Sequence, residues 1–251
     1  MKRPPATRPW LLRRPRTDAP ARLFLLPYSG MGASMYSRWP TVLGDTELCL
    51  VQLPGRENRL REPHFGGYDD LAPVLAEQLL PYLDRPFGFF GHCSGVLPAV
   101  VTARHLADHG LPTPDRLFVS SQVAPHRGPY SRFLSMTDEE LTEELNRLFV
   151  AMGGTTPHPE LVAMNLEVLK ANNAAYQAFR MPEPVPLPGR LHCIAWASDA
   201  DVPPALLAGW DSYVPADRYA FTVLEGEHYT FLSAPQPLMD LLSREMTGAL
   251  V

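Results

Sequence analysis

The chain has 251 residues, of which 45% are apolar and 20% charged, and its net charge is −5. This length suits one large domain or two small ones, and it can bury a core without disulfides or a structural metal. The apolar fraction excludes a wholly disordered chain. Since no apolar run approaches the roughly 18–20 residues of a bilayer span, a transmembrane protein is excluded as well.

Positive charge is concentrated at the N-terminus. Residues 1–22 contain seven of the 22 Lys and Arg residues and a single acid, Asp18, which leaves 15 basic and 26 acidic residues, a net charge of −11, in the remainder. A basic arm can bind nucleic acid, but this acidic remainder repels phosphate. We therefore expect no nucleic-acid partner, a disordered and solvated basic arm over residues 1–20, and a single domain over residues 21–251. The arm lacks the apolar stretch of a secretory signal.

The three cysteines are not clustered. Cys49 and Cys193 lie in short apolar runs and are typical of small core residues on strands. No Cys-x-x-Cys pair and no compact zinc-ligand set occurs, so no metal site is expected. This cysteine usage favours a reducing, cytoplasmic setting.

Short apolar runs alternate with helix-like segments along the chain. The runs predict strands over residues 22–27, 47–53, 87–90, 116–120, 191–196 and 219–224. Their near-continuous apolar character indicates strands covered on both faces, as in a parallel sheet. Helical patterns lie over residues 69–83, 94–108 and 235–246. This alternation predicts the α/β class, with a mostly parallel sheet and helices on both faces.

The alternation is interrupted over residues 125–188, which contain no strand signal. Helices are predicted there over residues 137–145 and 160–179, and Thr137 followed by Glu140 is a capping-box signature for the first of them. A helical insertion between strands of an α/β enzyme is commonly a mobile lid over the active site. The alternative is an ordinary pair of packing helices.

The pentapeptide Gly91-His92-Cys93-Ser94-Gly95 follows a predicted strand and begins a predicted helix. A nucleophile elbow requires this context, a sharp turn with small residues around a strained nucleophile. Cys93 is the candidate nucleophile, and a helix N-terminus and an adjacent histidine favour its thiolate. Ser94 lies one place off the apex, so its backbone N–H is instead the expected oxyanion donor. We interpret His92 as a packing residue. The alternative for the whole motif is a chance turn with a buried thiol.

Candidates for the acid and the base follow the last two predicted strands. Asp199 and Asp201 come after the strand that ends at Trp196, and His228 lies just past a glycine turn. This agrees with the chain order nucleophile, acid, histidine, at the carboxyl ends of strands. The histidine would accept the proton of the nucleophile, and the acid would hold its tautomer. A solvated turn and an ordinary loop histidine are the alternatives, and the choice between the two acids stays open.

The first strand runs into a loop of small residues, 27–34. Such a loop can present a second backbone N–H to an oxyanion. It could also be a phosphate loop, but the Gly-Lys-Ser/Thr ending of a P-loop is missing.

Five segments together resemble the type II thioesterases, stand-alone α/β hydrolases that accompany modular polyketide and nonribosomal peptide synthases. They are residues 23–30, 51–59, 91–95, 117–120 and 226–229, and the run Gln52-Leu-Pro-Gly-Arg-Glu-Asn-Arg59 is the most specific. The similarity covers about residues 20–247. It implies an α/β-hydrolase fold with a helical lid at about residues 125–188. It also implies removal of stalled or aberrant acyl groups from the phosphopantetheine arm of carrier proteins, without a cofactor of the enzyme's own.

The resemblance also implies roles for individual residues. Cys93 would be the nucleophile, His228 the base and Asp199 the acid, with the backbone N–H groups of Ser29 and Ser94 as oxyanion donors. Asp199 is preferred to Asp201 because the family pattern Gly-x-x-Asp-Pro-x-Val, matched without gaps to Val202 and Trp210, places the acid at position 199.

The sequence departs from the family at two positions: Cys93 replaces the usual serine, and Ala200 replaces the usual proline after the acid. Attack of a thiolate on a thioester gives another thioester, so the exchange is nearly balanced in energy. We expect a hydrolase. The alternatives are an acyltransferase or cyclising enzyme that uses the acyl-cysteine, and a non-catalytic module that binds carrier proteins.

Charge also bears on the partner. Carrier proteins of this kind are usually acidic, as is the body of this chain, so docking would rely on a local arginine cluster or on apolar lid surface. Arg127 and Arg132, at the start of the insertion, are the candidates. We expect a cytoplasmic monomer that binds neither nucleic acid nor a membrane.

Overall fold

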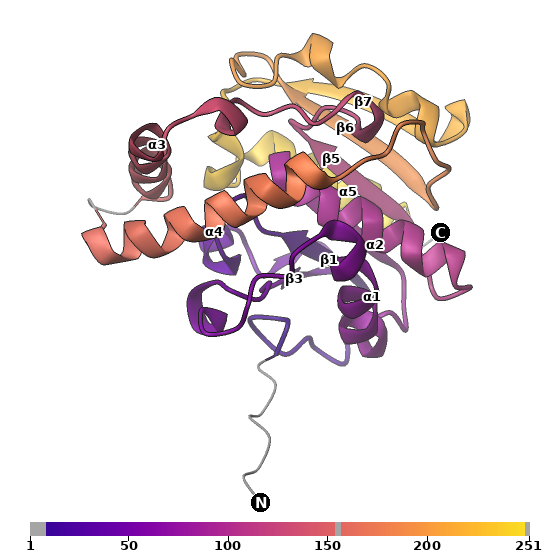
Figure 1. Ribbon diagram of the computed structural model, residues 1–251. Coiled ribbons are helices and arrows are strands. Elements are labelled where there is room, and N and C mark those ends of the chain that lie inside the picture. Colours follow the sequence, from indigo (N-terminus) through magenta and orange to yellow (C-terminus); the bar gives the residue numbers. More distant parts are fainter. Residues whose placement is uncertain (1–8, 154–156, 249–251) are drawn as a thin grey trace, which may run out of the picture.

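The computed structural model describes residues 9–153 and 157–248. At its centre lies a seven-stranded sheet in the order β2-β3-β1-β4-β5-β6-β7 (Figure 1). The strands are β1 (Ala21–Leu26), β2 (Val42–Leu43), β3 (Thr46–Leu50), β4 (Phe87–His92), β5 (Arg116–Ser120), β6 (Arg190–Trp196) and β7 (Tyr219–Leu224). All neighbours are parallel except β2 and β3. The six predicted strands and the mostly parallel sheet are confirmed, and only the short β2 was missed.

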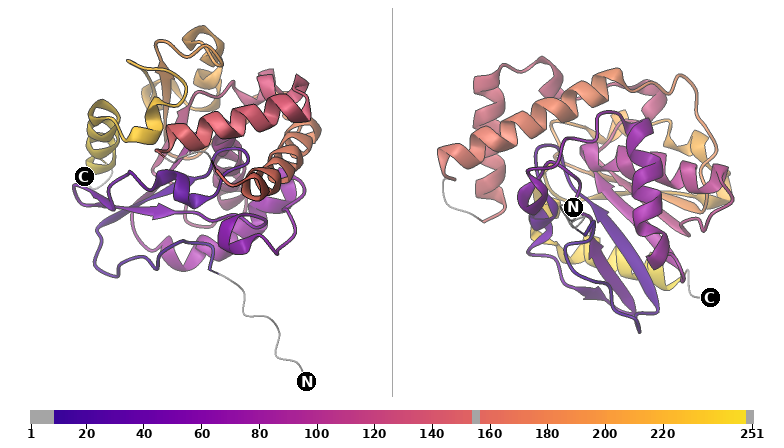
Figure 2. Two further views of the ribbon diagram at one scale, coloured as in Figure 1. Left: turned by 90° about the vertical axis from the view of Figure 1, so that its left-hand side faces the viewer. Right: turned by 60° about the horizontal axis from the view of Figure 1, so that its bottom comes forward.

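The helices are α1 (Tyr68–Leu79), α2 (Val96–Asp108), α3 (Asp138–Ala151), α4 (Pro159–Ala178) and α5 (Gln236–Thr247). Helices α1 and α2 pack together on one face of the sheet, and α5 covers the other (Figure 2). The prediction of helices on both faces is therefore confirmed. In the described ranges, no helix combines the length and the apolar character that a bilayer span requires.

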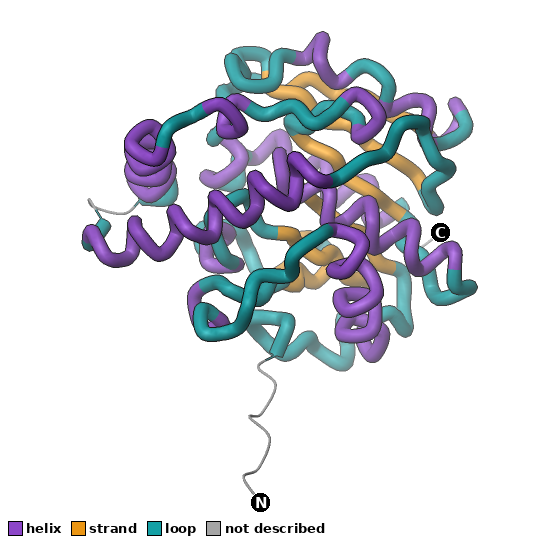
Figure 3. The backbone as a smooth tube through the Cα atoms, in the orientation of Figure 1, coloured by secondary structure: helices purple, strands orange, loops and turns teal. Residues whose placement is uncertain are grey.

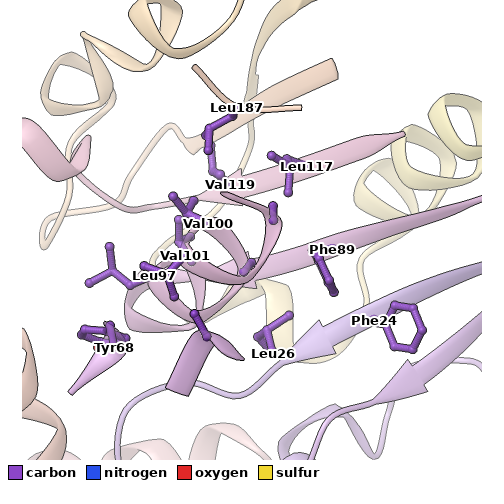
Figure 4. Close-up of a cluster of buried hydrophobic side chains, with 14 of the residues drawn as sticks. Phe24, Leu26, Tyr68, Phe89, Leu97, Val100, Val101, Leu117, Val119 and Leu187 are labelled. Carbon is purple, nitrogen blue, oxygen red and sulfur yellow. The ribbon is translucent and has the colours of Figure 1, made fainter. Parts of the chain in front are cut away.

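Alternate residues of each central strand enter different cores. In β1, Phe24 and Leu26 pack with α1 and α2, whereas Leu23 and Leu25 pack on the side of α5. Figure 4 shows the first of these clusters, in which Phe24 and Leu26 lie with Phe89 and with side chains of α2. Because both faces are covered, the central strands need apolar residues at nearly every position.

Strand β7 departs from this pattern. It is the last strand of the sheet, and its side chains Phe221 and Val223 are 44% and 47% exposed. The prediction that the apolar runs are all covered on both faces is therefore wrong for β7, because the face that carries these two alternate residues is left partly uncovered.

The insertion between β5 and β6 is helical, as predicted. Its described residues contain helices and loops but no strand (Figure 3). The capping box of α3 is present, with the Thr137 hydroxyl accepting from the Glu140 N–H at 3.3 Å and the Glu140 carboxylate accepting from the Thr137 N–H at 2.8 Å. Helix α4 packs against α3 and extends back over the sheet (Figure 1).

The N-terminal segment differs from the prediction of a disordered arm over residues 1–20. Residues 1–8 lie outside the described residues, but residues 9–20 run along the edge of the sheet, with Trp10 and Leu11 buried. The prediction is wrong for residues 9–20. It was based on the positive charge of the arginines, whereas burial of Trp10 and Leu11 orders the segment.

Backbone pairing fixes this segment. The Leu12 N–H donates to the Leu50 carbonyl at 2.9 Å, and the Gln52 N–H donates to the Trp10 carbonyl at 2.7 Å. The guanidinium of Arg59 lies 4.2 Å from the centre of the Trp10 ring, a cation–π contact. The segment thus extends the sheet next to the end of β3.

Candidate active site

Cys93 lies at the apex of a sharp turn directly after β4. Its φ is +50°, in the left-handed region that costs a non-glycine residue about 1–3 kcal/mol. A Cβ on Gly91 would lie 2.4 Å from the Gly95 carbonyl oxygen, and one on Gly95 would lie 2.8 Å from the Leu26 carbonyl oxygen. Both glycines are therefore required for the strand and the helix to approach, as a nucleophile elbow demands.

Asp199 and His228 meet at the carboxyl ends of β6 and β7. The His228 Nδ1 lies 2.9 Å from the Asp199 Oδ2, which also accepts from the Ser121 hydroxyl at 2.7 Å. The other carboxylate oxygen accepts the backbone N–H groups of Asp201 and Val202, each at 2.9 Å. The carboxylate thus accepts four contacts and holds the imidazole by its Nδ1, so that Nε2 faces away from Asp199.

Asp201, the other acid left open by the sequence, points elsewhere. Its carboxylate lies 2.8 Å from the Nε of Arg132 on the insertion. Of the two acids, the structure brings only Asp199 to His228.

The environment favours a charged pair. Burial alone would lower the pKa of His228, but its bonds with Asp199 and Cys93 outweigh burial and raise that pKa to about 10. Burial likewise opposes ionisation of Asp199, yet the bond with His228, together with those from Val202 and Ser121, lowers its pKa. At neutral pH the site therefore holds an imidazolium beside a carboxylate.

Tyr28 is a site residue that sequence reasoning missed. Its buried hydroxyl lies 3.3 Å from the His228 Nε2, on the side of the ring away from Asp199. Tyr28 belongs to the loop that was predicted only to supply the Ser29 N–H. The signal in the sequence was its position at the end of the first strand, which is the neighbour of β4 in the sheet.

His92 has a packing role, as interpreted from the sequence. Its Nδ1 lies 2.9 Å from the Ser120 hydroxyl, and its ring stacks on Phe231 at a centroid distance of 3.8 Å. Burial, and then the charge on His228, hold the pKa of His92 well below its ordinary value. His92 is therefore an uncharged ring that packs against His228, with the ring centres 4.7 Å apart.

The two expected oxyanion donors lie on neighbouring loops. β1 and β4 are parallel neighbours with Leu26 opposite Gly91, so the chain leaves both strands at the same edge of the sheet. Ser29 follows β1, and Ser94 lies in the short turn Cys93–Gly95 at the elbow. The topology therefore places both backbone segments at the edge of the sheet where Cys93 lies.

A buried arginine supports the loop after β1, and sequence reasoning assigned it no role. Arg56 donates to the carbonyls of Tyr28 at 3.2 Å and Met31 at 2.7 Å, and to the Asn172 side-chain oxygen at 2.9 Å. The same Asn172 oxygen accepts the Gly30 N–H at 3.1 Å. Burial lowers the pKa of Arg56 to about 10, so it stays charged at neutral pH. The signal was available, since Arg56 lies in the most specific run of the resemblance.

The other two cysteines are core residues, as predicted. Cys49 and Cys193 are 4% and 0% exposed, and burial raises the pKa of each thiol to about 12. Among the described residues, no three His, Cys, Asp or Glu side chains are grouped so as to hold a metal ion.

Cys93 is nearly buried in an apolar cluster to which the insertion contributes. It is 8% exposed, and the cluster includes Phe133, Leu145 and Leu169 of the insertion. Of the two arginines predicted as docking candidates, Arg132 pairs with the carboxylates of Glu144 and Asp201, and its side chain is 33% exposed. Docking through Arg132 stays a prediction.

Arg127 is exposed, in the short turn Pro125–Arg127 at the start of the insertion. Docking through Arg127 likewise stays a prediction.

Comparisons with known proteins agree with this geometry. A family model described as "Thioesterase domain" matches residues 21–245. The protein named linear gramicidin dehydrogenase LgrE of Brevibacillus parabrevis is 31% identical over 255 residues, covering 96% of this chain and 94% of its own. Among solved structures, the RedJ thioesterase of the prodiginine pathway in Streptomyces coelicolor is 30% identical with a TM-score of 0.74, covering 90% of this chain and 91% of that one.

A second solved structure, the type II thioesterase BorB of the borrelidin cluster, is 26% identical with a TM-score of 0.77 and covers 94% of this chain and 97% of its own. These matches confirm the α/β-hydrolase fold that the resemblance implied. The chain belongs to the thioesterase domain family.

Proposed function

We propose that the protein is a type II thioesterase of a polyketide or nonribosomal peptide pathway, which hydrolyses acyl groups from the phosphopantetheine arm of carrier proteins. The observation that carries the proposal is Cys93 at a strained elbow beside the bonded pair His228–Asp199. RedJ of the prodiginine pathway and BorB of the borrelidin cluster support the class of pathway. The enzyme would act as a cytoplasmic monomer, and the phosphopantetheine belongs to the substrate.

The reaction begins with the Cys93 thiolate, which attacks the thioester carbonyl carbon. The oxyanion formed accepts from the N–H groups of Ser29 and Ser94. When the intermediate collapses, the bond to the pantetheine sulfur breaks, and that sulfur takes the proton from the His228 Nε2. His228 then removes a proton from water, and the hydroxide attacks the acyl-Cys93 carbonyl. The free acid leaves, and Cys93 returns as a thiolate beside protonated His228.

Acyl transfer is a second candidate, for a specific reason. The acyl-Cys93 intermediate is itself a thioester, and the site around it is closed, with Cys93 and His228 only 8% and 5% exposed. Where water is excluded, an amine, hydroxyl or second thiol that reaches the site competes with hydrolysis. A cyclising reaction would use an acceptor on the acyl chain itself.

Substrate access in this proposal depends on the insertion. A phosphopantetheine arm must reach Cys93, which is 8% exposed and shares an apolar cluster with residues of the insertion, so residues of about 130–180 would move as a lid.

The test is mass spectrometry of the intact protein after incubation with acyl-carrier thioesters of different chain lengths. Covalent loading on Cys93 and release of free acid support the hydrolase, whereas a transferred or cyclised acyl group supports the second candidate. Cys93→Ala should abolish both loading and turnover, because no other side chain occupies the elbow apex. Cys193→Ala, which removes a buried thiol outside the site, is the matched control and should still load. Loading or turnover of Cys93→Ala at the unmodified protein's rate would refute the nucleophile assignment.

Cys93→Ser separates the two candidates. Serine is nearly the same size and would use the same base, so hydrolysis should remain measurable. The ester it forms is a poorer acyl donor than the native thioester, and any transfer to amines or thiols should suffer more than hydrolysis. Equal losses in both reactions would contradict an acyl-Cys93 donor.

A further inference from the structure

A chain of hydrogen-bonding side chains connects the insertion to the catalytic histidine. Its outer end is Glu144 of α3, a carboxylate that is only 2% exposed. The carboxylate is paired with Arg132 and with Arg147, whose Nε donates to it at 2.9 Å, and it also accepts the hydroxyl of Tyr229. Glu144 is thus a buried anion with a bond that leads into the site.

The inner end of the chain is His228. Tyr229 follows it directly, and the Tyr229 ring packs edge-on against Tyr28 at a centroid distance of 6.0 Å. Burial, and then the neighbouring Tyr229 with which its hydroxyl bonds, raise the pKa of Tyr28 well above its ordinary value, so Tyr28 stays protonated. Its hydroxyl oxygen lies 3.3 Å from the His228 Nε2.

The ionisation of Glu144 fixes which group donates and which accepts in each of these hydrogen bonds. Burial opposes ionisation of Glu144, but the bonds from Tyr229, Arg147 and Arg132 lower its pKa, so it is a carboxylate and can only accept. Tyr229 therefore donates to Glu144, and its oxygen is available to the Tyr28 hydroxyl. Once Tyr28 donates to Tyr229, the Tyr28 oxygen faces His228 as an acceptor.

We infer that Glu144, acting through Tyr229 and Tyr28, is a positioning residue that holds the proton on the His228 Nε2 and so keeps Cys93 in its reactive thiolate form. The inference rests on the proposed function, in which Cys93 is the nucleophile. Asp199 fixes the imidazolium at Nδ1, and the tyrosine chain adds an acceptor at Nε2 beside the thiolate. A hydrogen bond to the charged form of a group favours that form.

The other groups around the two ends are compatible with this role. His228 is faced by Asp199 after β6, Cys93 after β4, Tyr28 after β1 and the neutral ring of His92. All of these except His92 can accept from or bond to an imidazolium.

Glu144 is faced by Arg132, Arg147 and Tyr229, and Asp201 lies on the far side of Arg132. Loss of the Tyr229 hydroxyl would therefore leave Glu144 still paired with two arginines, so Tyr229→Phe breaks the chain without stranding a buried charge.

The test measures the rate at which iodoacetamide alkylates Cys93 as a function of pH, by peptide mass spectrometry. In Tyr229→Phe the pH of half-maximal rate should rise by about 0.5–1 unit, which slows alkylation about three- to tenfold below that pH. Tyr213→Phe is the matched control. It removes a buried hydroxyl that bonds to His126 and lies in the other core cluster, so the profile should not move.

A second variant tests whether Tyr229 acts through Tyr28. Tyr28→Phe should give at least as large a shift, and the double variant should shift no further than Tyr28→Phe alone, because Tyr229 acts through Tyr28. Fully additive shifts, or an unmoved profile in Tyr229→Phe with Cys93 still alkylated, would overturn the inference and leave the proposed function standing. If Cys93 of the unmodified protein is not alkylated ahead of Cys49 and Cys193, both are overturned.

Discussion

The two sides of the candidate site are held in different ways. On the sheet side, Cys93, Asp199 and His228 each follow a strand within a few residues, so the backbone of β4, β6 and β7 fixes their positions. On the insertion side, side chains contribute, through apolar residues such as Leu145 and through the charged Glu144. The comparison teaches that the backbone positions Cys93, Asp199 and His228, whereas their surroundings on the insertion side depend on side-chain contacts that single substitutions can remove.

The largest effect should come from the sheet side. Asp199→Asn keeps the shape of the acid but no longer fixes the imidazole in the required tautomer and charge, so kcat/KM for an acyl-carrier substrate should fall by about 10²–10⁴-fold. Asp201→Asn is the control, because this carboxylate faces Arg132 and not His228. A larger loss in Asp201→Asn than in Asp199→Asn would reverse the assignment of the acid.

The second prediction compares local unfolding of the insertion with that of the central strands. Amides of α3 and α4 should exchange with solvent at least about 10²-fold faster, after correction for intrinsic rates, than those of β1, β4 and β5. The reason is that the central strands are buried on both faces, while the insertion packs on one side. Equally slow exchange throughout the insertion would contradict its assignment as a lid.

Acid should widen this difference. Glu144 has a pKa below its ordinary 4.5, so its ionised form stabilises the folded insertion above that value, and the contribution is lost as the pH falls through the lower folded-state pKa. Exchange of α3, again corrected for intrinsic rates, should therefore accelerate relative to the strands by about tenfold between about pH 5 and pH 3. In Glu144→Gln this extra pH dependence should be absent. A dependence that persists in that variant would show that another group is responsible.

The smallest effect concerns the outer surface of the insertion. Arg127→Glu should lower kcat/KM for an acyl-carrier substrate by about two- to fivefold and leave a small acyl-pantetheine thioester unaffected, because an exposed charge acts mainly on encounter. Arg132→Glu provides the contrast. It breaks internal pairs with Glu144 and Asp201 and should impair both substrates. If kcat/KM for the acyl-carrier substrate is unchanged in Arg127→Glu, Arg127 takes no part in docking.

Much of the sheet side could be predicted from the sequence because its signals are local. Apolar runs mark the strands, the two glycines around Cys93 mark the turn, and Thr137 with Glu140 marks the start of α3. The placement of His228 after the last strand follows from the known chain order of such sites. These features depend on residues that are neighbours in the sequence.

The missed features depend on residues that are far apart. Tyr28 and His228 are 200 positions apart, and Glu144 and Tyr229 are 85 apart, so no local pattern connects them. A glutamate in a charged helix such as α3 is typical of a solvated face, and only the packing of the insertion shows that it is buried. The ion pairs of Arg132 with Glu144 and Asp201 could not be predicted for the same reason.

The segment at residues 9–12 limits how far the N-terminus of this protein can be shortened. β2 pairs with the first half of β3, and Trp10 and Leu12 pair with the backbone around Leu50, so together they shield the outer edge of the sheet. An unshielded strand edge is a template for another chain. A variant that begins at residue 21, where the family match begins, would keep Cys93, Asp199 and His228 yet present such an edge, and it should self-associate more readily than the full chain. The boundary of the sequence family is therefore not the boundary of the folding unit.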